Sequence, residues 1–423
     1  MSEWKALSSI TSKIGSGSTP RGGNSVYSDS GISFIRSQNV LDMDFSTENL
    51  AFINDNQAEK LNNVIVEKND ILLNITGDSI ARCTVVPEEI LPARVNQHVS
   101  IIRCKNTEES KYVMYYLQYM KKYLLQISKV GGTRNALTKE AIGKLPIKIS
   151  DECNEISKIL DNIDQKIQIN NQINQELEAM AKTLYDYWFV QFDFPDQNGK
   201  PYKSSGGKMV YNPELKREIP EGWGVEKLGE LIQLERGVTY AKSDIVEKTT
   251  NDAIGVLRAT NITGNVMDLN DLVYLTKDII NNKQIIKQNE TLIVMSSGSK
   301  EHLGKNAINY YEEVIGFGAF CSKIVPQKYS AYINTFLQSS EFKGYLLKQS
   351  MGTNINNLTN SDILDCRIIL PNEEILDKFE NMIEKNIKLI SNNYIQNQEL
   401  TQLRDWLLPM LMNGQVKVEN YTD

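Results

Sequence analysis

The chain has 423 residues, which is enough for two or three domains and excludes a single small module. Its formal net charge is −7 and its isoelectric point lies near 5.3, so net charge alone does not draw it to nucleic acid. Hydrophobic residues make up 41% and charged residues 23% of the chain, as in folded soluble proteins, and this composition excludes global disorder.

The cysteines and the N-terminus indicate a cytoplasmic protein. The five cysteines are an odd number, widely scattered and without a CxxC pair, which predicts reduced, buried thiols. No basic segment followed by an apolar run opens the chain, and no apolar run approaches the roughly eighteen residues that span a bilayer. We therefore expect neither secretion nor membrane insertion. Only His98 and His302 are available for histidine-based zinc or acid–base chemistry.

An internal repeat organises the chain. Four short strings recur in the same order at offsets of 220 to 223 residues: FIRSQNV at 34–40 and VLRATNI at 256–262, Gly132-Thr133 and Gly352-Thr353, Leu137-Thr138 and Leu358-Thr359, and NQEL at 174–177 and 397–400. The constant order and spacing make chance a poor explanation. The sequence therefore predicts a tandem duplication of a unit of roughly 220 residues.

The first part of each repeat mixes short β-rich runs with turns, and it also contains apolar residues at helical spacing. The predicted strands are ISFIR at 32–36, DILLNI at 70–75, HVSIIRC at 98–104 and TLIVM at 291–295, and the predicted helices lie at 112–128 and 332–349. We therefore expect an α+β globule at 1–150 and a second one at 222–372.

The second part of each repeat is predicted to be a long helix. Neither Gly nor Pro occurs from Asp151 to Asp186, and apolar residues recur there in a seven-residue pattern. The same pattern runs from Glu373 to Met412, interrupted only by Pro409. Asn170 and Asn397 fall in or beside this apolar stripe, where polar residues commonly fix the register. Because duplicated halves of one chain are usually related by a pseudo-two-fold axis, we expect the helices to pair antiparallel.

The predicted fold class is therefore α+β, with two β-rich globules separated by two long antiparallel coiled-coil helices. A segment rich in Gly, Ser, Pro and Lys between the repeats is typical of an exposed connector. The resulting boundaries are 1–150 for the first globule, 151–193 for the first helix, 194–221 for the connector, 222–372 for the second globule, and 373–423 for the second helix and tail.

The motifs that would indicate an enzyme are incomplete. GSGSTPRGG at 15–23 lacks the GxGxxG spacing, and GSKEHLGK at 298–305 has five residues between its glycines where a P-loop needs four. The SxxK spacing from Ser297 to Lys300 lacks companion motifs, and no DPPY or NPPY tetrad occurs. We therefore assign no catalytic, cofactor-binding or metal-binding residue.

Polar loops of both globules offer side chains suited to reading base edges in the DNA major groove, where Arg and Lys pair with guanine and Asn and Gln with adenine. The candidates are Arg21, Arg36, Gln38, Asn39, Arg82, Asn96, Gln97, His98, Arg134 and Asn135 in the first globule, and Arg236, Lys242, Arg258, Asn261, Lys300, His302, Lys305, Asn306, Asn354 and Asn356 in the second. Taken singly, each is more simply a solvated loop residue or turn former. Arg36, Asn39 and their repeats are equally strand-end residues that satisfy buried backbone groups.

Four strings together resemble one family, the DNA-specificity subunits of Type I restriction-modification enzymes. The strings are GDSIARCTVVPEEILPARVNQHVSIIR at 77–103, GGTRNALTKEAIGKLPI at 131–147, GKPYKSSGGKMVYNPELKREIPEGW at 199–223, and GSKEHLGKNAI with FGAFC in the second half. The resemblance covers essentially the full length and agrees with the duplicated layout.

The resemblance implies two target-recognition domains, each binding one half of a split site in double-stranded DNA, held apart by paired spacer helices. It also implies that the helices dock two adenine-methylating subunits and, in the complete enzyme, restriction subunits that translocate and cut DNA. The chain itself is then a non-catalytic subunit without a cofactor, and S-adenosylmethionine is expected on the methyltransferase subunit.

Several alternatives stay open at this point. NQHV at 96–99 matches the family in the first half, whereas the corresponding stretch of the second half reads GFGAFC at 316–321. A DNA contact and a structural role of His98 are therefore both open. Two other classes of function compete with DNA recognition: a coiled-coil adaptor, and a stand-alone DNA-modifying enzyme without a recognisable catalytic motif.

The negative charge is distributed unevenly along the chain. The net charges are +3 for 1–150, −6 for 151–193, +1 for 194–221, −1 for 222–372 and −4 for 373–423. The acidity lies in the helical segments, where protein partners are expected rather than phosphates. We therefore expect the chain alone to bind DNA weakly and the methyltransferase subunits to provide much of the positive surface.

Overall fold

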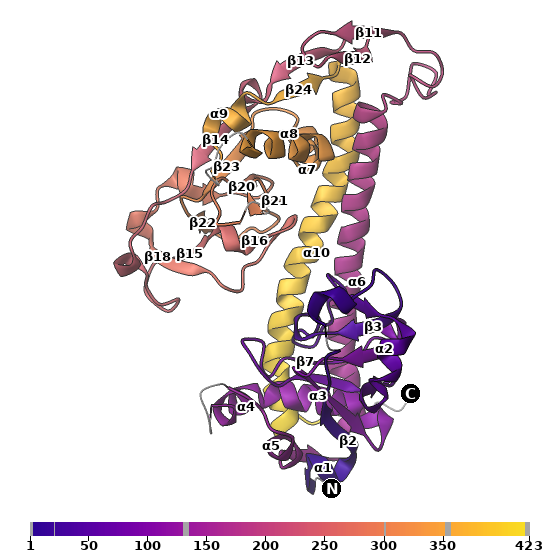
Figure 1. Ribbon diagram of the computed structural model, residues 1–423. Helices are drawn as coiled ribbons and strands as arrows, with labels where there is room; N and C mark the ends of the chain where they lie inside the picture. The colour runs from indigo at the N-terminus through magenta and orange to yellow at the C-terminus, as the bar shows by residue number, and fades with distance from the viewer. Residues whose placement is uncertain (1–2, 21, 130–134, 300–301, 352–356, 419–423) are drawn as a thin grey trace. The chain divides into compact units, whose positions relative to one another are not determined.

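The computed structural model describes residues 3–418 except 21, 130–134, 300–301 and 352–356. The chain divides into unit 1, formed by residues 1–168 and 398–423, and unit 2, formed by residues 169–397. Each unit combines one β-rich globule with parts of two long helices, α6 (Cys153–Tyr185) and α10 (Glu373–Asn413) (Figure 1). No helix in the described ranges is long and apolar enough to cross a membrane.

The globule of unit 1 contains two four-stranded sheets and a two-stranded ribbon. The first sheet has the order β2-β9-β6-β7 with antiparallel neighbours, and the second has the order β4-β3-β8-β5, in which β3 and β8 run parallel. The strands are β1 (Glu3–Ala6), β2 (Thr11–Ser16), β3 (Ile32–Ile35), β4 (Ala51–Ile53), β5 (Ile65–Val66), β6 (Ile71–Asn74), β7 (Cys83–Val85), β8 (Ala93–Val95), β9 (Val99–Cys104) and β10 (Pro146–Ile149). The helices are α1 (Leu7–Ile10), α2 (Asp55–Glu59), α3 (Ser110–Tyr119), α4 (Lys121–Ile127) and α5 (Lys139–Gly143).

The globule of unit 2 repeats this topology. Its sheets have the orders β14-β23-β20-β21 and β18-β15-β22-β19, and β13 pairs with β24 as β1 pairs with β10. The strands are β13 (Gly224–Lys227), β14 (Ile232–Arg236), β15 (Ala253–Leu257), β18 (Val273–Thr276), β19 (Ile285–Ile286), β20 (Thr291–Val294), β21 (Asn306–Ile308), β22 (Ile315–Phe317), β23 (Cys321–Pro326) and β24 (Arg367–Leu370). The helices are α7 (Ser330–Gln338), α8 (Ser340–Met351) and α9 (Asn360–Leu364). The matching order confirms the predicted α+β fold and the tandem duplication.

Two small hairpins of unit 2 lie outside these sheets, and the second has a counterpart in unit 1, the antiparallel bridge between Val40 and Phe45. The connector between α6 and β13 forms the hairpin β11 (Met209–Asn212) and β12 (Arg217–Pro220), and β16 (Ile262–Thr263) pairs with β17 (Val266–Met267). A π-helical turn, Asp186–Val190, follows α6 directly.

The two globular helices predicted as continuous are each broken once. Met120, with φ −81° and ψ 4°, separates α3 from α4, and Ser339 separates α7 from α8. The backbone of Ser339 is extended, and its hydroxyl accepts a hydrogen bond of 3.2 Å from the amide of Phe342 in the first turn of α8. Because one non-helical residue leaves the apolar spacing on either side intact, periodicity does not reveal such a break.

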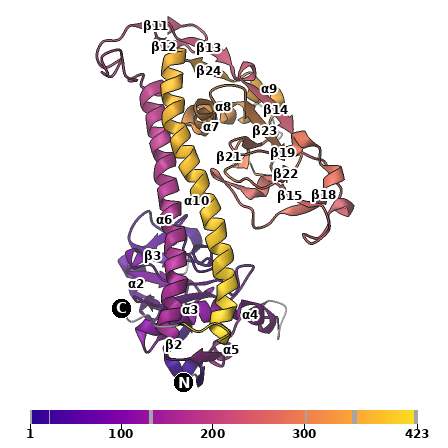
Figure 2. The same ribbon diagram turned by 180° about the vertical axis from the view of Figure 1, so that it is seen from behind.

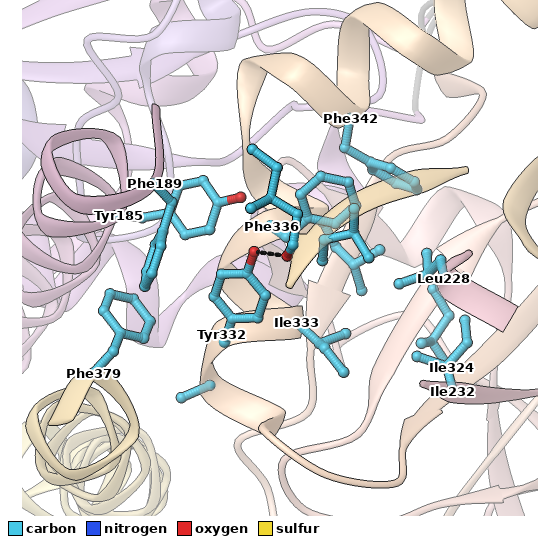
Figure 3. Packing of buried hydrophobic residues seen from close by; sticks show 14 of the residues in the cluster. Tyr185, Phe189, Leu228, Ile232, Ile324, Tyr332, Ile333, Phe336, Phe342 and Phe379 are labelled. Atoms are coloured by element: carbon cyan, nitrogen blue, oxygen red, sulfur yellow. Dashed lines mark hydrogen bonds between the residues drawn. The ribbon is translucent and has the colours of Figure 1, made fainter. Parts of the chain in front are cut away.

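Each globule is completed by side chains from both long helices. In unit 2, Tyr185 of α6 and Phe189 of the π-turn meet Tyr332 of α7 and Phe379 of α10 (Figure 3). The ring centroids of Phe189 lie 4.8 Å from Tyr332 and 5.0 Å from Phe379. The Tyr332 hydroxyl donates a hydrogen bond of 2.6 Å to the carbonyl of Ile369 in β24, the dashed line in Figure 3.

Unit 1 repeats this arrangement with aliphatic residues. Leu408, Leu411 and Met412 at the end of α10 pack in one core with Ile156 of α6 and Tyr112 of α3. The Tyr112 hydroxyl donates to the carbonyl of Lys148 at 2.7 Å, as Tyr332 does to Ile369 in unit 2. In each unit, the end of one long helix and the start of the other therefore share a core with the globule.

A layer of buried asparagines pairs the helices in unit 2. The Asn170 amide donates to Asn397 Oδ1 at 2.9 Å, and the Asn393 amide donates to Asn174 Oδ1 at 2.8 Å. Figure 2 shows the ribbons of α6 and α10, the two helices to which these residues belong. The partner's number falls as the residue number rises, so the helices run antiparallel there. The repeat offset of 223 residues converts the first pair into the second, because it relates Asn170 to Asn393 and Asn174 to Asn397. The two asparagine pairs are therefore related by the pseudo-two-fold symmetry expected from the duplication.

We predict that Asn170→Ala destabilises unit 2 by about 1–3 kcal/mol, since it removes buried hydrogen bonds to Asn397 and Gln396. The midpoint of urea unfolding should fall. Gln172→Ala on the exposed side of the same helix is the control and should leave the midpoint nearly unchanged. Equal midpoints for the two variants would contradict a paired, buried layer.

Candidate nucleic-acid interface

Four loops of unit 1 converge at one end of the antiparallel sheet. They are residues 17–19 after β2, residues 75–76 after β6, residues 96–98 before β9, and residues 135–137 before α5. Backbone hydrogen bonds of 2.9 Å join them, from Gly17 to Val99, from Ile75 to His98 and from Leu137 to Ile75. The loops therefore form one continuous, fixed surface, which we call loop cluster 1.

The same bonds recur in unit 2. Gly237 donates to Cys321 at 3.2 Å, Met295 to Phe320 at 2.9 Å and Leu358 to Met295 at 2.7 Å. They join residues 237–239, 295–296, 318–320 and 357–358, which we call loop cluster 2. Through these bonds Ile75 matches Met295, and His98 matches Phe320. NQH at 96–98 therefore corresponds to GAF at 318–320.

Glycine is required where the first loop of each cluster crosses the third. A Cβ atom on Gly17 would collide with the carbonyl oxygens of Val95 and Asn96, and one on Gly237 would collide with those of Phe317 and Gly318. The glycine-rich stretch at 15–23 thus has a local structural use in the close approach of two backbones.

The side chains of loop cluster 1 form a polar chain around His98. The ring Nδ1 of His98 lies 2.6 Å from Thr76 Oγ1, and its Nε2 lies 3.2 Å from Gln97 Nε2. The Thr19 hydroxyl donates a hydrogen bond to the side-chain oxygen Oε1 of Gln97. Asn96 is buried, and its Oδ1 accepts from the His98 amide at 3.1 Å. Gln97 is exposed and His98 half-buried, so Gln97 lies at the surface of the cluster while Asn96 holds the turn.

Arg82 and Lys305 occupy one equivalent position in the two globules. The Asn74 amide bonds the Arg82 carbonyl at 2.8 Å, and the Val294 amide bonds the Lys305 carbonyl at 2.9 Å, in the turns after β6 and β20. Both side chains are half-buried, and neither has a hydrogen-bond or ion-pair partner within the described part of the chain. A positive charge is thus available beside each loop cluster.

The repeated Arg and Asn pairs support their own globules. Asn39 is fully buried, accepts from the Arg36 amide at 3.1 Å and donates to the Ser46 carbonyl at 2.9 Å. Asn261 makes the same bonds to the Arg258 amide and the Asp268 carbonyl, at 2.9 and 3.0 Å. The guanidinium groups of Arg36 and Arg258 each donate to a carbonyl thirteen residues further on. These contacts favour the strand-end structural role over base contact, most clearly for the two asparagines.

The remaining candidates lie in different settings. Asn135, Arg236 and Lys242 are exposed, and Arg236 Nε donates at 3.4 Å to the Ala319 carbonyl in loop cluster 2. Gln38 is exposed and bonds the Asn49 carbonyl at 3.4 Å, and His302 is half-buried. Asn306 is buried and donates to the Leu337 carbonyl at 2.9 Å. Arg21, Arg134, Lys300, Asn354 and Asn356 lie outside the described residues. As DNA contacts, all of these residues stay predictions.

The interface contains a large apolar side chain that the polar candidate set omitted. Phe320, the counterpart of His98, is 65% exposed in loop cluster 2. The sequence signal was the GFGAFC stretch, since the repeat offset of 222 residues pairs Phe320 with His98. The matching backbone bonds confirm this pairing.

The described residues contain neither a cluster suited to a metal ion nor, beside Phe320, a reactive thiol. No cluster of three or more His, Cys, Asp or Glu residues suited to a metal ion occurs among the described residues. Burial raises the pKa of Cys321, next to Phe320, to about 12, so this thiol stays neutral and is a poor nucleophile. All five cysteines are buried and unpaired, as the sequence predicted.

We predict that Gly17→Ala destabilises unit 1 by about 1–3 kcal/mol, because the added methyl group must displace the backbone of residues 95–96. Calorimetry should show a lower unfolding temperature. Gly15→Ala is the matched control, since a Cβ there meets nothing within 4 Å. If both variants unfold at one temperature, the close approach of the two loops is wrong.

Comparison with known proteins agrees with the duplicated structure. The family model for the Type I restriction modification DNA specificity domain matches twice, at residues 2–179 and 220–399. The MjaIX specificity subunit of Methanocaldococcus jannaschii is 28% identical over 344 residues, covering 78% of this chain and 74% of that protein. The EcoKI specificity subunit of Escherichia coli is 36% identical over 143 residues, which are 33% of this chain and 31% of that protein.

A solved structure shows the same fold. The S subunit of a Type-I restriction-modification system from M. genitalium aligns with 97% of this chain and 96% of its own, at a TM-score of 0.51 and 12% identity. Because the family model matches each repeat separately, the duplication and the family resemblance are confirmed together. The chain belongs to the Type I restriction-modification DNA specificity family.

Proposed function

We propose that this chain is the sequence-specificity subunit of a Type I restriction-modification complex, and that each globule reads one half of a bipartite site in the major groove of double-stranded DNA. The observation that supports the proposal most strongly is that the same hydrogen-bonded loop cluster occurs once in each repeat. The chain that contains these clusters belongs to the DNA specificity family. The subunit binds and performs no reaction itself, and S-adenosylmethionine belongs to the partner methyltransferase. The family membership disfavours both the adaptor and the stand-alone enzyme.

The loop clusters supply the two kinds of contact that DNA recognition requires. Phosphate contacts position a protein on the duplex, and contacts to base edges provide specificity. We assign Arg82 and Lys305 to phosphates, because Arg and Lys share a charge but differ in hydrogen-bond geometry. Gln97 and His98 then offer hydrogen bonds to bases in the first half-site.

The long helices present an apolar, acidic surface suited to protein partners. Their exposed large apolar residues are Ile169, Met180, Met382, Leu389, Leu403 and Trp406. Met180, Met382 and Leu403 are 61%, 49% and 43% exposed. We propose that two methyltransferase subunits cover these residues, one for each repeat, in the cytoplasm, and that restriction subunits join in the complete enzyme.

Selection from a randomised DNA pool with the purified complex of this chain and methyltransferase subunits tests the proposal. We expect enrichment of a split motif with unread bases between two short blocks. Recovery of DNA without any enriched motif would favour the adaptor.

We predict that Arg82→Ala weakens DNA binding by the methyltransferase complex to a similar extent on all sequences, and lowers the slope of log affinity against log salt by about 1. Titrations across a salt series measure this slope. Arg82→Lys is the control and should restore most of the affinity, because a phosphate needs only the charge. Loss confined to one base pair of one half-site would show instead that Arg82 reads a base.

We predict that inserting seven residues into α6, together with seven facing residues in α10, lengthens the unread gap of the DNA site. Seven helical residues add about 10 Å, or roughly three base pairs. Sequencing of methylated DNA from cells that carry the variant measures the gap. A site recognised with its original gap would disprove the idea that the helices set the half-site spacing.

A further inference from the structure

Hydrogen bonds hold the backbone of Phe320 in place, whereas its side chain is exposed. It lies between β22 and β23, and at 65% it is the most exposed large apolar side chain among the described residues. Its carbonyl accepts hydrogen bonds from the amides of Met295 at 2.9 Å and Ser296 at 3.2 Å, and the neighbouring Ala319 amide donates to Val238 at 2.9 Å. Fixing the backbone removes the entropy cost of ordering the loop on binding, and an aromatic side chain has only two χ angles left to order.

The equivalent position in unit 1 has the opposite chemistry. There His98 accepts the corresponding bond from Ile75 through its carbonyl, while its ring joins Thr76 and Gln97 in a polar chain. In unit 2, Ala319 and Phe320 replace Gln97 and His98, so this loop offers no hydrogen-bonding side chain at these two positions. The same loop conformation thus presents polar side chains, Gln97 and His98, in the first globule and apolar side chains, Ala319 and Phe320, in the second.

We propose that Phe320 is a specificity-determining residue that packs on the C5-methyl group of a thymine in the half-site read by the second globule. The thymine methyl is the apolar feature of the major groove, and phenylalanine is one of the side chains that contact it. Arg236, bonded to the Ala319 carbonyl at 3.4 Å, places a positive charge on the same loop, which favours its approach to DNA. The inference rests on the proposed function and names the base chemistry of one contact.

Deoxyuridine substitution tests the inference, since it removes only the methyl group of thymine. With the methyltransferase complex bound to the selected site, each thymine is replaced in turn. We expect one position, in one half-site, where the wild-type complex binds about fourfold more weakly without the methyl group. Phe320→Ala should bind thymine DNA more weakly and no longer distinguish thymine from deoxyuridine at that position. Unchanged unfolding temperatures verify that the variant folds.

Val314→Ala is the matched control, because Val314 is 61% exposed in the same globule but lies outside loop cluster 2. It should retain the discrimination of the wild type. The inference is overturned if Phe320→Ala still distinguishes the methyl group at every thymine, if neither half-site contains a sensitive thymine, or if the variant loses methyltransferase subunits instead. In each case the wild type still selects a split motif, whereas absence of any motif would overturn the proposed function itself.

Discussion

Each globule depends on a core that both long helices complete. In unit 2 the aromatic end of α6 and the first turns of α10 enclose Tyr332, and in unit 1 the end of α10 and the start of α6 enclose Tyr112. Buried apolar area of this kind is the main source of stability in a folded unit. The consequence is that neither repeat contains everything its own globule needs, and each globule uses the long helix of the other repeat.

The asparagine layer fixes the register in which the two long helices pack. An aliphatic layer would bury more apolar surface, but it would tolerate sliding of one helix along the other. Amide pairs such as Asn170 with Asn397 require one alignment, because a shifted helix would leave buried polar groups without partners. Such a constraint fits the proposed role of the helices in setting the spacing of the two half-sites.

Much of the fold follows from local sequence patterns, whereas the interface depends on distant parts of the chain. The repeat strings, the helix from Glu373 and the buried strand at 291–295 are properties of short windows, and the structure confirms them. The pattern of apolar residues does not reveal the break between α7 and α8, because the single extended residue Ser339 causes it. The commitment of Asn39 to carbonyls of residues 46 and 48 was foreseen only as an alternative, since it depends on how the chain turns back. Phe320 was missed because the candidates were restricted to polar side chains, whereas its 65% exposure depends on how the loop folds.

Two equivalent loop clusters in one duplicated frame are proposed to read the two half-sites. Replacing residues 222–372 with a second copy of residues 1–150 tests this proposal most directly, because both globules then carry the same loops. Sequencing of methylated DNA from cells that contain this variant and the methyltransferase subunits should reveal a split motif whose halves are inverted copies of one half-site of the original. A motif that keeps both original half-sites would contradict the account.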